Sequence, residues 1–206
     1  MVKDYIISKH IKDYQIIVLF LYLFFIYTIM GNNRKPSSSG GRKRNGKKRY
    51  NQGFYQIINT NKFMGDPNKC IYRSGWELKF MMFLDRNDKI LRWGSENITI
   101  PYYTEDRSNG VLKSHRYYPD FYYELMINND PHNFQRVVVE VKPFKETQPP
   151  KPPTKETVKA LETYEYQLKT FQKNMLKWES AVKWCNANKM KFVIIHEGHL
   201  KENNIM

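Results

Sequence analysis

The sequence is poor in cysteine and lacks the short motifs of several enzyme classes. Its 206 residues include two cysteines, Cys70 and Cys185, which match no Cys-x-x-Cys or Cys/His metal spacing. Free thiols in a reducing compartment are therefore expected, and a disulfide-stapled secreted domain is not. His132, His196 and His199 show no zinc-ligand spacing with one another. The absence of a glycine-rich phosphate loop and of a nucleophile elbow argues against nucleotide-binding and serine-hydrolase folds.

Acidic residues are missing from residues 31–65, which carry nine basic ones. The chain has a net charge of +14, of which this segment supplies +9 and residues 66–206 only +4. Residues 31–53 are also nearly free of apolar side chains, so we expect a basic arm that is disordered until it meets a partner. Such an arm neutralises DNA phosphates, although a solvated tail or a localisation signal has the same composition. The predicted DNA contacts here are Arg42, Lys43, Arg44, Lys47, Lys48 and Arg49.

Residues 14–30 form the one long apolar run, with basic residues on both sides. Their length is close to the lower limit for a membrane-spanning helix, and no signal-peptide cleavage site follows. Three interpretations stay open. Residues 14–30 are a membrane anchor, or residues 1–29 are an upstream extension of a reading frame that starts at Met30, or the run is a buried helix. A membrane partner is expected only under the first.

The remaining sequence, residues 54–206, predicts one α/β domain with a central sheet. A helix over residues 74–88 begins at a Ser74 cap, and a long helix precedes a closing strand. The run of three valines at residues 137–139 indicates a strand buried on both faces. An Asn-Gly turn signal predicts a hairpin before the last of the first three strands. The expected strands are residues 89–94, 96–103, 114–127, 134–142 and 191–196.

The long helix is expected over residues 154–187. Apolar residues there step by three and four positions, which predicts a single apolar seam. Docking on the protein's own sheet is the favoured use of this seam, and a coiled-coil dimer is the alternative. The seam residues are Leu161, Tyr164, Leu168, Phe171, Met175, Trp178, Val182 and Cys185.

The chemistry is expected where Pro119-Asp120 and Glu140-Val141-Lys142 meet. Side chains at i and i+2 of a strand share a face, so Glu140 and Lys142 emerge together. A turn within residues 128–133 places Asp120 beside them. Mg²⁺ is held typically by one or two carboxylates, and the Val141 carbonyl is a further candidate ligand. Lys142 is then suited to orient an attacking water or to stabilise charge on the phosphate.

Glu77, near the start of the first helix, is the fourth candidate and reaches toward the same metal or a second one. Each of these residues has a structural alternative. Glu77 would form a capping box with Ser74. Asp120 would be an ordinary acid at a turn or strand end, and Glu140 and Lys142 would be charges on the exposed edge of a buried strand. Further basic residues flank the site and are either phosphate contacts or solvated charges. They are Arg73, His115 and Arg116.

The pattern of Glu77, Pro119-Asp120 and Glu140-Val141-Lys142 resembles the PD-(D/E)xK nuclease superfamily, whose core has the same order of elements. More specifically, four segments resemble the head-completion nuclease family of tailed phages, and at a greater distance endonucleases of the TnsA type. These segments are YRSGWE (72–77), WGSE (93–96), IPYY (100–103) and VEVKPFKETQPP (139–150).

This resemblance implies a restriction-endonuclease-like fold that hydrolyses DNA with Mg²⁺ or Mn²⁺ late in head assembly. By motif match, Glu77, Asp120, Glu140 and Lys142 are the site. The implied partners are double-stranded DNA and portal or head proteins, in the virion and in the host cytoplasm during assembly. The apolar segment and the long basic arm are departures from the family pattern. The competing functions are a structural virion protein with a vestigial nuclease site, a transposon-end endonuclease, and a membrane-tethered factor.

Overall fold

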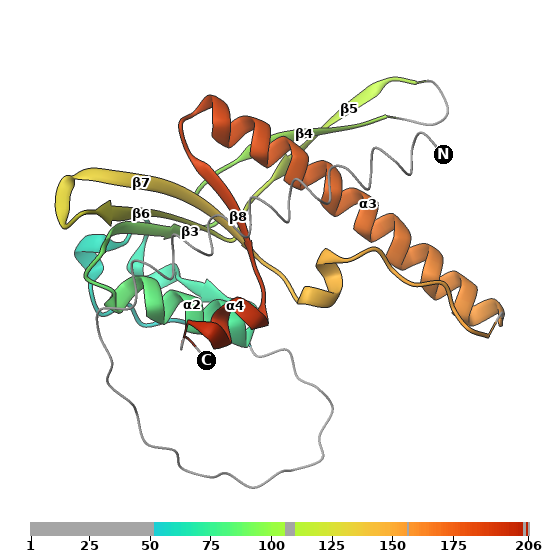
Figure 1. Ribbon diagram of the computed structural model, residues 1–206, viewed down its shortest axis with the longest axis horizontal. Coiled ribbons are helices and arrows are strands. Elements are labelled where there is room, and N and C mark those ends of the chain that lie inside the picture. Colours follow the sequence, from blue (N-terminus) through green and yellow to red (C-terminus); the bar gives the residue numbers. More distant parts are fainter. Residues whose placement is uncertain (1–51, 106–109, 156, 204, 206) are drawn as a thin grey trace, which may run out of the picture.

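The computed structural model describes residues 52–105, 110–155, 157–203 and 205 (Figure 1). The apolar segment 14–30 and the six basic arm residues lie outside these ranges. The end of the predicted arm is an exception, because Gly53 belongs to β1 (Gly53–Phe54), which pairs with β2 (Ile71–Tyr72). Within the described ranges, no helix combines the length and the apolar character needed to cross a membrane.

A four-stranded mixed sheet forms the centre of the domain, in the order β3-β6-β7-β8. The first three strands pair antiparallel, whereas β7 and β8 are parallel and need a crossover, which α3 supplies. The predicted α/β class with a central sheet, a long helix and a closing strand is confirmed. The strands are β3 (Ile90–Ser95), β6 (Phe121–Ile127), β7 (Asp130–Val141) and β8 (Lys191–Ile195).

Helices cover both faces of this sheet. In Figure 1, α2 (Gly75–Arg86) and the short α4 (Glu197–Glu202) lie on one side, and α3 (Val158–Ala187) lies on the other. The valines of β7 therefore alternate between two cores. Val139 and Val141 pack in the core with α2, and Val138 packs in the core with α3. This explains why the strand is apolar on both faces.

Residues 114–127, predicted as one strand, are two. β5 (Leu112–Tyr117) pairs with β4 (Ile100–Glu105) in a separate ribbon, and β6 starts only after Pro119-Asp120. A proline has no backbone N–H to donate to a ladder, so the chain leaves one sheet before it and enters the next after it. The predicted hairpin is present as the β4–β5 ribbon. Asp120 consequently sits at a junction between two sheets.

The turn before β7 is shorter than predicted. Asn128 and Asn129 both have positive φ, at 52° and 57°, and β7 already begins at Asp130. A two-residue turn with both residues in the left-handed region matches the twist of a hairpin, and asparagine tolerates this conformation. The close β6–β7 pairing fixes the register that aligns the site.

Helix α3 starts at Val158, capped by the Thr157 hydroxyl, four residues later than predicted. Only the C-terminal half of its apolar seam is buried. Phe171, Trp178 and Cys185 are buried, whereas Leu161 at the other end is 43% exposed. The N-terminal half of the helix projects beyond the sheet (Figure 1), and the seam residues Tyr164 and Leu168 there are only half-buried.

Asp85 anchors the chain that enters the fold. Its buried carboxylate accepts hydrogen bonds from the Tyr55 hydroxyl at 2.8 Å and from the backbone N–H groups of Ile58 and Asn59 at 2.8 and 2.9 Å. Burial alone would raise the pKa of Asp85, but these donors outweigh it and hold the pKa below its usual value. The carboxylate is therefore a structural group that ties residues 55–59 to α2.

Candidate active site

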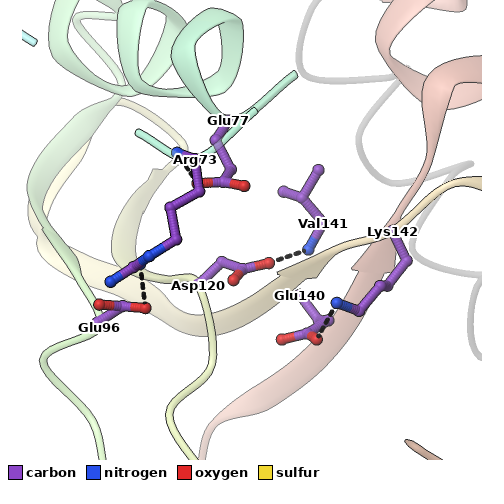
Figure 2. A network of polar contacts seen from close by, with 7 residues as sticks. All are labelled: Arg73, Glu77, Glu96, Asp120, Glu140, Val141 and Lys142. Carbon is purple, nitrogen blue, oxygen red and sulfur yellow. Dashed lines mark hydrogen bonds and ion pairs between the residues drawn. The ribbon is translucent and has the colours of Figure 1, made fainter. Parts of the chain in front are cut away.

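Asp120 and Glu140 lie side by side at the ends of adjacent strands. Phe121 pairs with Val139, so the antiparallel register places Asp120 opposite Glu140. The Asp120 Oδ2 atom accepts a hydrogen bond of 2.7 Å from the backbone N–H of Val141 (Figure 2). The two carboxylates predicted to meet are thus brought together, in an arrangement fixed by backbone pairing.

The environment of the Asp120 carboxyl disfavours its charged form. Burial and the neighbouring Glu140 carboxylate raise the pKa of Asp120 well above its ordinary value, and Glu77 adds to this effect. The Val141 N–H and the Lys142 ammonium act in the opposite direction without cancelling it. Two close carboxylates with a pKa raised by burial and by each other's charge are typical of a functional site.

Glu140 is 4% exposed and uses both carboxylate oxygens. Its Oε2 accepts a hydrogen bond of 2.7 Å from the Tyr117 hydroxyl, and its Oε1 lies 3.2 Å from the Lys142 Nζ. Val141, between them, faces the opposite core, as the strand alternation predicts. Burial alone would lower the pKa of Lys142, but the carboxylates of Glu140 and Asp120 hold it above its usual value. Lys142 is therefore a charged, 27% exposed donor at the site.

Glu77 approaches from α2 and forms only half of the capping box. The Ser74 hydroxyl accepts from the Glu77 N–H at 3.1 Å, but the Glu77 carboxylate accepts from the Arg73 N–H at 2.8 Å instead of the Ser74 N–H. This contact uses Oε2 alone. In Figure 2 the carboxylate points from the helix toward Asp120, whose pKa it raises. Capping and a role at the site are thus compatible.

Arg73 and Glu96 lie beside Glu77, on the side of the site that faces α2 (Figure 2). The Arg73 guanidinium forms an ion pair with Glu96, and this hydrogen bond raises the pKa of Arg73 (Figure 2). Glu96 adopts a positive φ of 49°, which is uncommon for a non-glycine residue and holds its side chain at the end of β3. Arg73 also lies within electrostatic reach of Glu77 and Asp120.

The other predicted DNA contacts are arranged differently. His115 lies inside the β4–β5 ribbon, with a ring nitrogen 2.8 Å from the Thr104 hydroxyl and its ring stacked on Tyr102. Arg116 is exposed on the opposite face of the ribbon from Tyr117. Neither is part of the carboxylate cluster, and a role for them as phosphate contacts stays a prediction.

The chemistry of the donor set fits a hard divalent cation. Mg²⁺ takes oxygen ligands, commonly one or two carboxylates, and keeps several waters. Asp120 and Glu140 supply such a pair, and Asp120 Oδ1 accepts no hydrogen bond from the described residues. Within the described ranges, no three or more His, Cys, Asp or Glu side chains are close enough to form a metal-binding group. The oxygen donors that suit such a cation are therefore the two carboxylates at the neighbouring strand ends.

Comparisons with known proteins identify two related groups of sequences. Residues 87–197 match the family model described as TnsA-like endonuclease N terminal, a range that includes Asp120, Glu140 and Lys142 but not Glu77. The head completion nuclease of Enterobacteria phage T4 is 36% identical over 143 residues, which cover 69% of this chain and 89% of that protein. The chain belongs to the head-completion nuclease family, within the TnsA-like endonucleases. No solved structure matches the chain.

Sequence reasoning missed two members of this nuclease's polar cluster. Tyr117 precedes the Pro-Asp pair by two residues, and only the register of the β4–β5 ribbon brings its hydroxyl to Glu140. Glu96 lies within the WGSE segment, but its backbone conformation and its ion pair with Arg73 depend on the tertiary structure. A buried tyrosine next to a site acid has no signature in spacing alone.

Proposed function

We propose that the protein is a divalent-metal-dependent DNA endonuclease that acts in phage head completion. Membership of a nuclease family supplies the reaction class, which is hydrolysis of DNA. The observation that carries the proposal is the convergence of Asp120, Glu140 and Lys142 at two adjacent strand ends. A buried Glu140 and a half-buried Asp120 beside a charged lysine have no packing function that apolar side chains would not serve better.

Each residue has a distinct task in this proposal. Asp120 and Glu140 hold Mg²⁺ or Mn²⁺, with the Val141 carbonyl and Glu77 as further ligands. When bound, such an ion polarises the attacked phosphate and lowers the pKa of a coordinated water. Lys142 keeps its proton at Nζ and donates hydrogen bonds to the water or to a phosphate oxygen as negative charge develops. Tyr117 holds the Glu140 carboxylate in place.

The substrate is double-stranded DNA, and the basic residues within 31–53 bind its phosphates electrostatically. Portal and head proteins are the proposed assembly partners, and the proposed locations are the host cytoplasm during assembly and the virion head. The relative's name, head completion nuclease, and the basic balance of this chain support these assignments.

Plasmid nicking tests the proposal. Supercoiled plasmid is incubated with the full-length chain and Mg²⁺ or Mn²⁺, beside Asp120→Asn, Glu140→Gln and Lys142→Gln. We expect metal-dependent nicking that each substitution reduces at least about 100-fold, because each removes a group used in the transition state. Asp88→Asn, which changes an exposed carboxylate on the loop after α2, is the matched control and should retain activity.

A folded wild-type protein that binds DNA but does not nick it with either metal would contradict the proposal. The vestigial-site alternative would then account for the same fold. Circular dichroism of each variant separates loss of chemistry from loss of structure.

A further inference from the structure

Lys177 approaches the carboxylate cluster from α3, an element that the motif does not include. Its Nζ lies 5.4 Å from the centre of the Tyr117 ring, and the Tyr117 hydroxyl donates to Glu140. Lys177 is half-buried, between the buried residues Asn174 and Trp178. The lysine is therefore held over the tyrosine that positions a site carboxylate.

The charges around Lys177 are those of the site. Burial lowers its pKa, Glu140 and Asp120 oppose this, and the ammonium groups of Lys142 and Lys173 lower it further. Among the described residues, however, no carboxylate lies within ion-pair distance of Lys177, whereas Lys142 is paired with Glu140. Lys177 thus keeps its hydrogen-bond donors available at the edge of the cluster.

Lys173 is a second lysine on the same side of α3, one turn before Lys177. Lys173 is exposed and forms no ion pair within the described ranges. Its positive charge lowers the pKa of Lys177. Like charges four positions apart on a helix repel, so this pair is unfavourable for the helix itself. One turn further out, Lys169 is matched by Glu165 at 3.9 Å. Of the lysines at positions 169, 173 and 177, only Lys173 and Lys177, the two nearest the site, have no carboxylate partner among the described residues.

We propose that Lys173 and Lys177 are a phosphate-binding pair that holds the DNA strand against the α3 side of the active site. Four residues of helix rise about 6 Å, so the two ammonium groups can contact successive backbone phosphates. An anion between them relieves their repulsion and supplies the hydrogen-bond acceptors that both lack. The inference rests on the proposed function, because it assigns the substrate-contacting surface of the same site.

The experiment measures DNA binding and cleavage separately. Affinity of the full-length chain for a fluorescent DNA duplex is measured with EDTA over a series of KCl concentrations, for Lys177→Gln, Lys173→Gln and the double variant. We expect a loss of affinity of about tenfold per substitution at low salt. The slope of log affinity against log salt should fall by about 0.9 per lysine removed. Lys183→Gln, an exposed lysine elsewhere on α3, is the control and should leave both unchanged.

Cleavage distinguishes strand binding from chemistry. For the two variants KM should rise while kcat stays within a few-fold of wild type, and Lys177→Arg should restore most of the affinity. Wild-type affinity and salt slope in the folded double variant would overturn the inference. If the wild type never nicks DNA yet its salt slope depends on Lys173 and Lys177, the phosphate-binding pair survives and the endonuclease proposal fails.

Discussion

At the scale of single residues, the site is built at a cost to the fold. Asp120 and Glu140 are neighbouring carboxylates in a corner with little water, and burial together with Glu140 raises the pKa of Asp120. A carboxyl group whose folded-state pKa is raised lowers the stability of the folded state at pH values above its unfolded-state pKa. Removal of this charge should therefore stabilise the protein while it destroys the function.

The variant Asp120→Asn tests this trade-off. Without divalent ions, we expect its free energy of unfolding to exceed that of the wild type by on the order of 1 kcal/mol, since the amide still accepts the Val141 hydrogen bond. Thermal unfolding in EDTA measures the difference. Added Mg²⁺ should stabilise the wild type but not the variant, because only the native carboxylate pair binds the ion. Equal Mg²⁺ shifts for both proteins would argue against Asp120 as a ligand.

Asp85 is predicted to behave in the opposite way. Asp85→Ala leaves the buried Tyr55 hydroxyl and two partly buried backbone N–H groups without an acceptor, which should cost about 3 kcal/mol. Because the folded pKa lies below the ordinary value of 3.8, this contribution is present above about pH 4 and is lost as the pH falls through the folded pKa. Urea unfolding at several pH values measures it. A difference between wild type and variant that does not shrink in acid would contradict the assignment.

The site residues that the sequence revealed are those governed by strand alternation. Glu140 and Lys142 share a face because they are two apart, and their ion pair follows from that spacing. Tyr117, Glu96 and Lys177 lie on three other elements, and their approach depends on how a ribbon, a strand end and a crossover helix pack. No local pattern encodes such distances.

At the scale of elements, α3 combines a buried half with a projecting half. The 3,4 spacing predicted the seam correctly, but spacing cannot say where the sheet beneath it ends. The seam residue Leu161 is 43% exposed, whereas Leu84 of α2 is fully buried. Sequence therefore identified the helix and its apolar face, and the extent of the sheet decides how much of that face is covered.

A matched pair of leucine substitutions makes this difference measurable. Leu84→Ala should lower the free energy of unfolding by about 2–5 kcal/mol, because it opens a cavity in the core. Leu161→Ala should lower it by less than about 1 kcal/mol, since little apolar area returns to water. Chemical denaturation of both variants gives the comparison. A large loss at Leu161 would mean that a second chain covers the seam, as in the coiled-coil alternative.

The first turn of α2 couples stability to the site. Ser74→Ala removes the hydroxyl that accepts from the Glu77 N–H, which should cost about 1 kcal/mol of stability. It should also lower nicking activity, because the same turn orients the Glu77 carboxylate, and Ser74→Thr should restore both. Thermal unfolding and plasmid nicking measured on the same preparations test this. Unchanged activity in a destabilised Ser74→Ala variant would place Glu77 outside the chemistry.

At the scale of the whole molecule, positive charge is concentrated outside the nuclease core. Residues 31–53, which precede the domain, carry +8 of the net +14. Replacement of Arg42, Lys43, Arg44, Lys47, Lys48 and Arg49 by glutamine should lower the slope of log affinity against log salt by up to about 5. Activity at saturating DNA should stay near wild type, because these residues do not belong to the carboxylate cluster. An unchanged slope would show that the basic segment makes no phosphate contacts.

The parallel pairing of β7 with β8 also determines when the enzyme becomes active during its synthesis. The backbone N–H of Lys142, the residue after β7, donates to the carbonyl of Ile195, so Lys142 is held in place only after β8 has been translated and has paired with β7. At about 5–20 residues per second, the ribosome needs roughly 3–10 s between these positions. Under the proposed function, residues 31–53 are therefore translated before the candidate site is assembled, and contact of this segment with DNA would precede the ability to cut it.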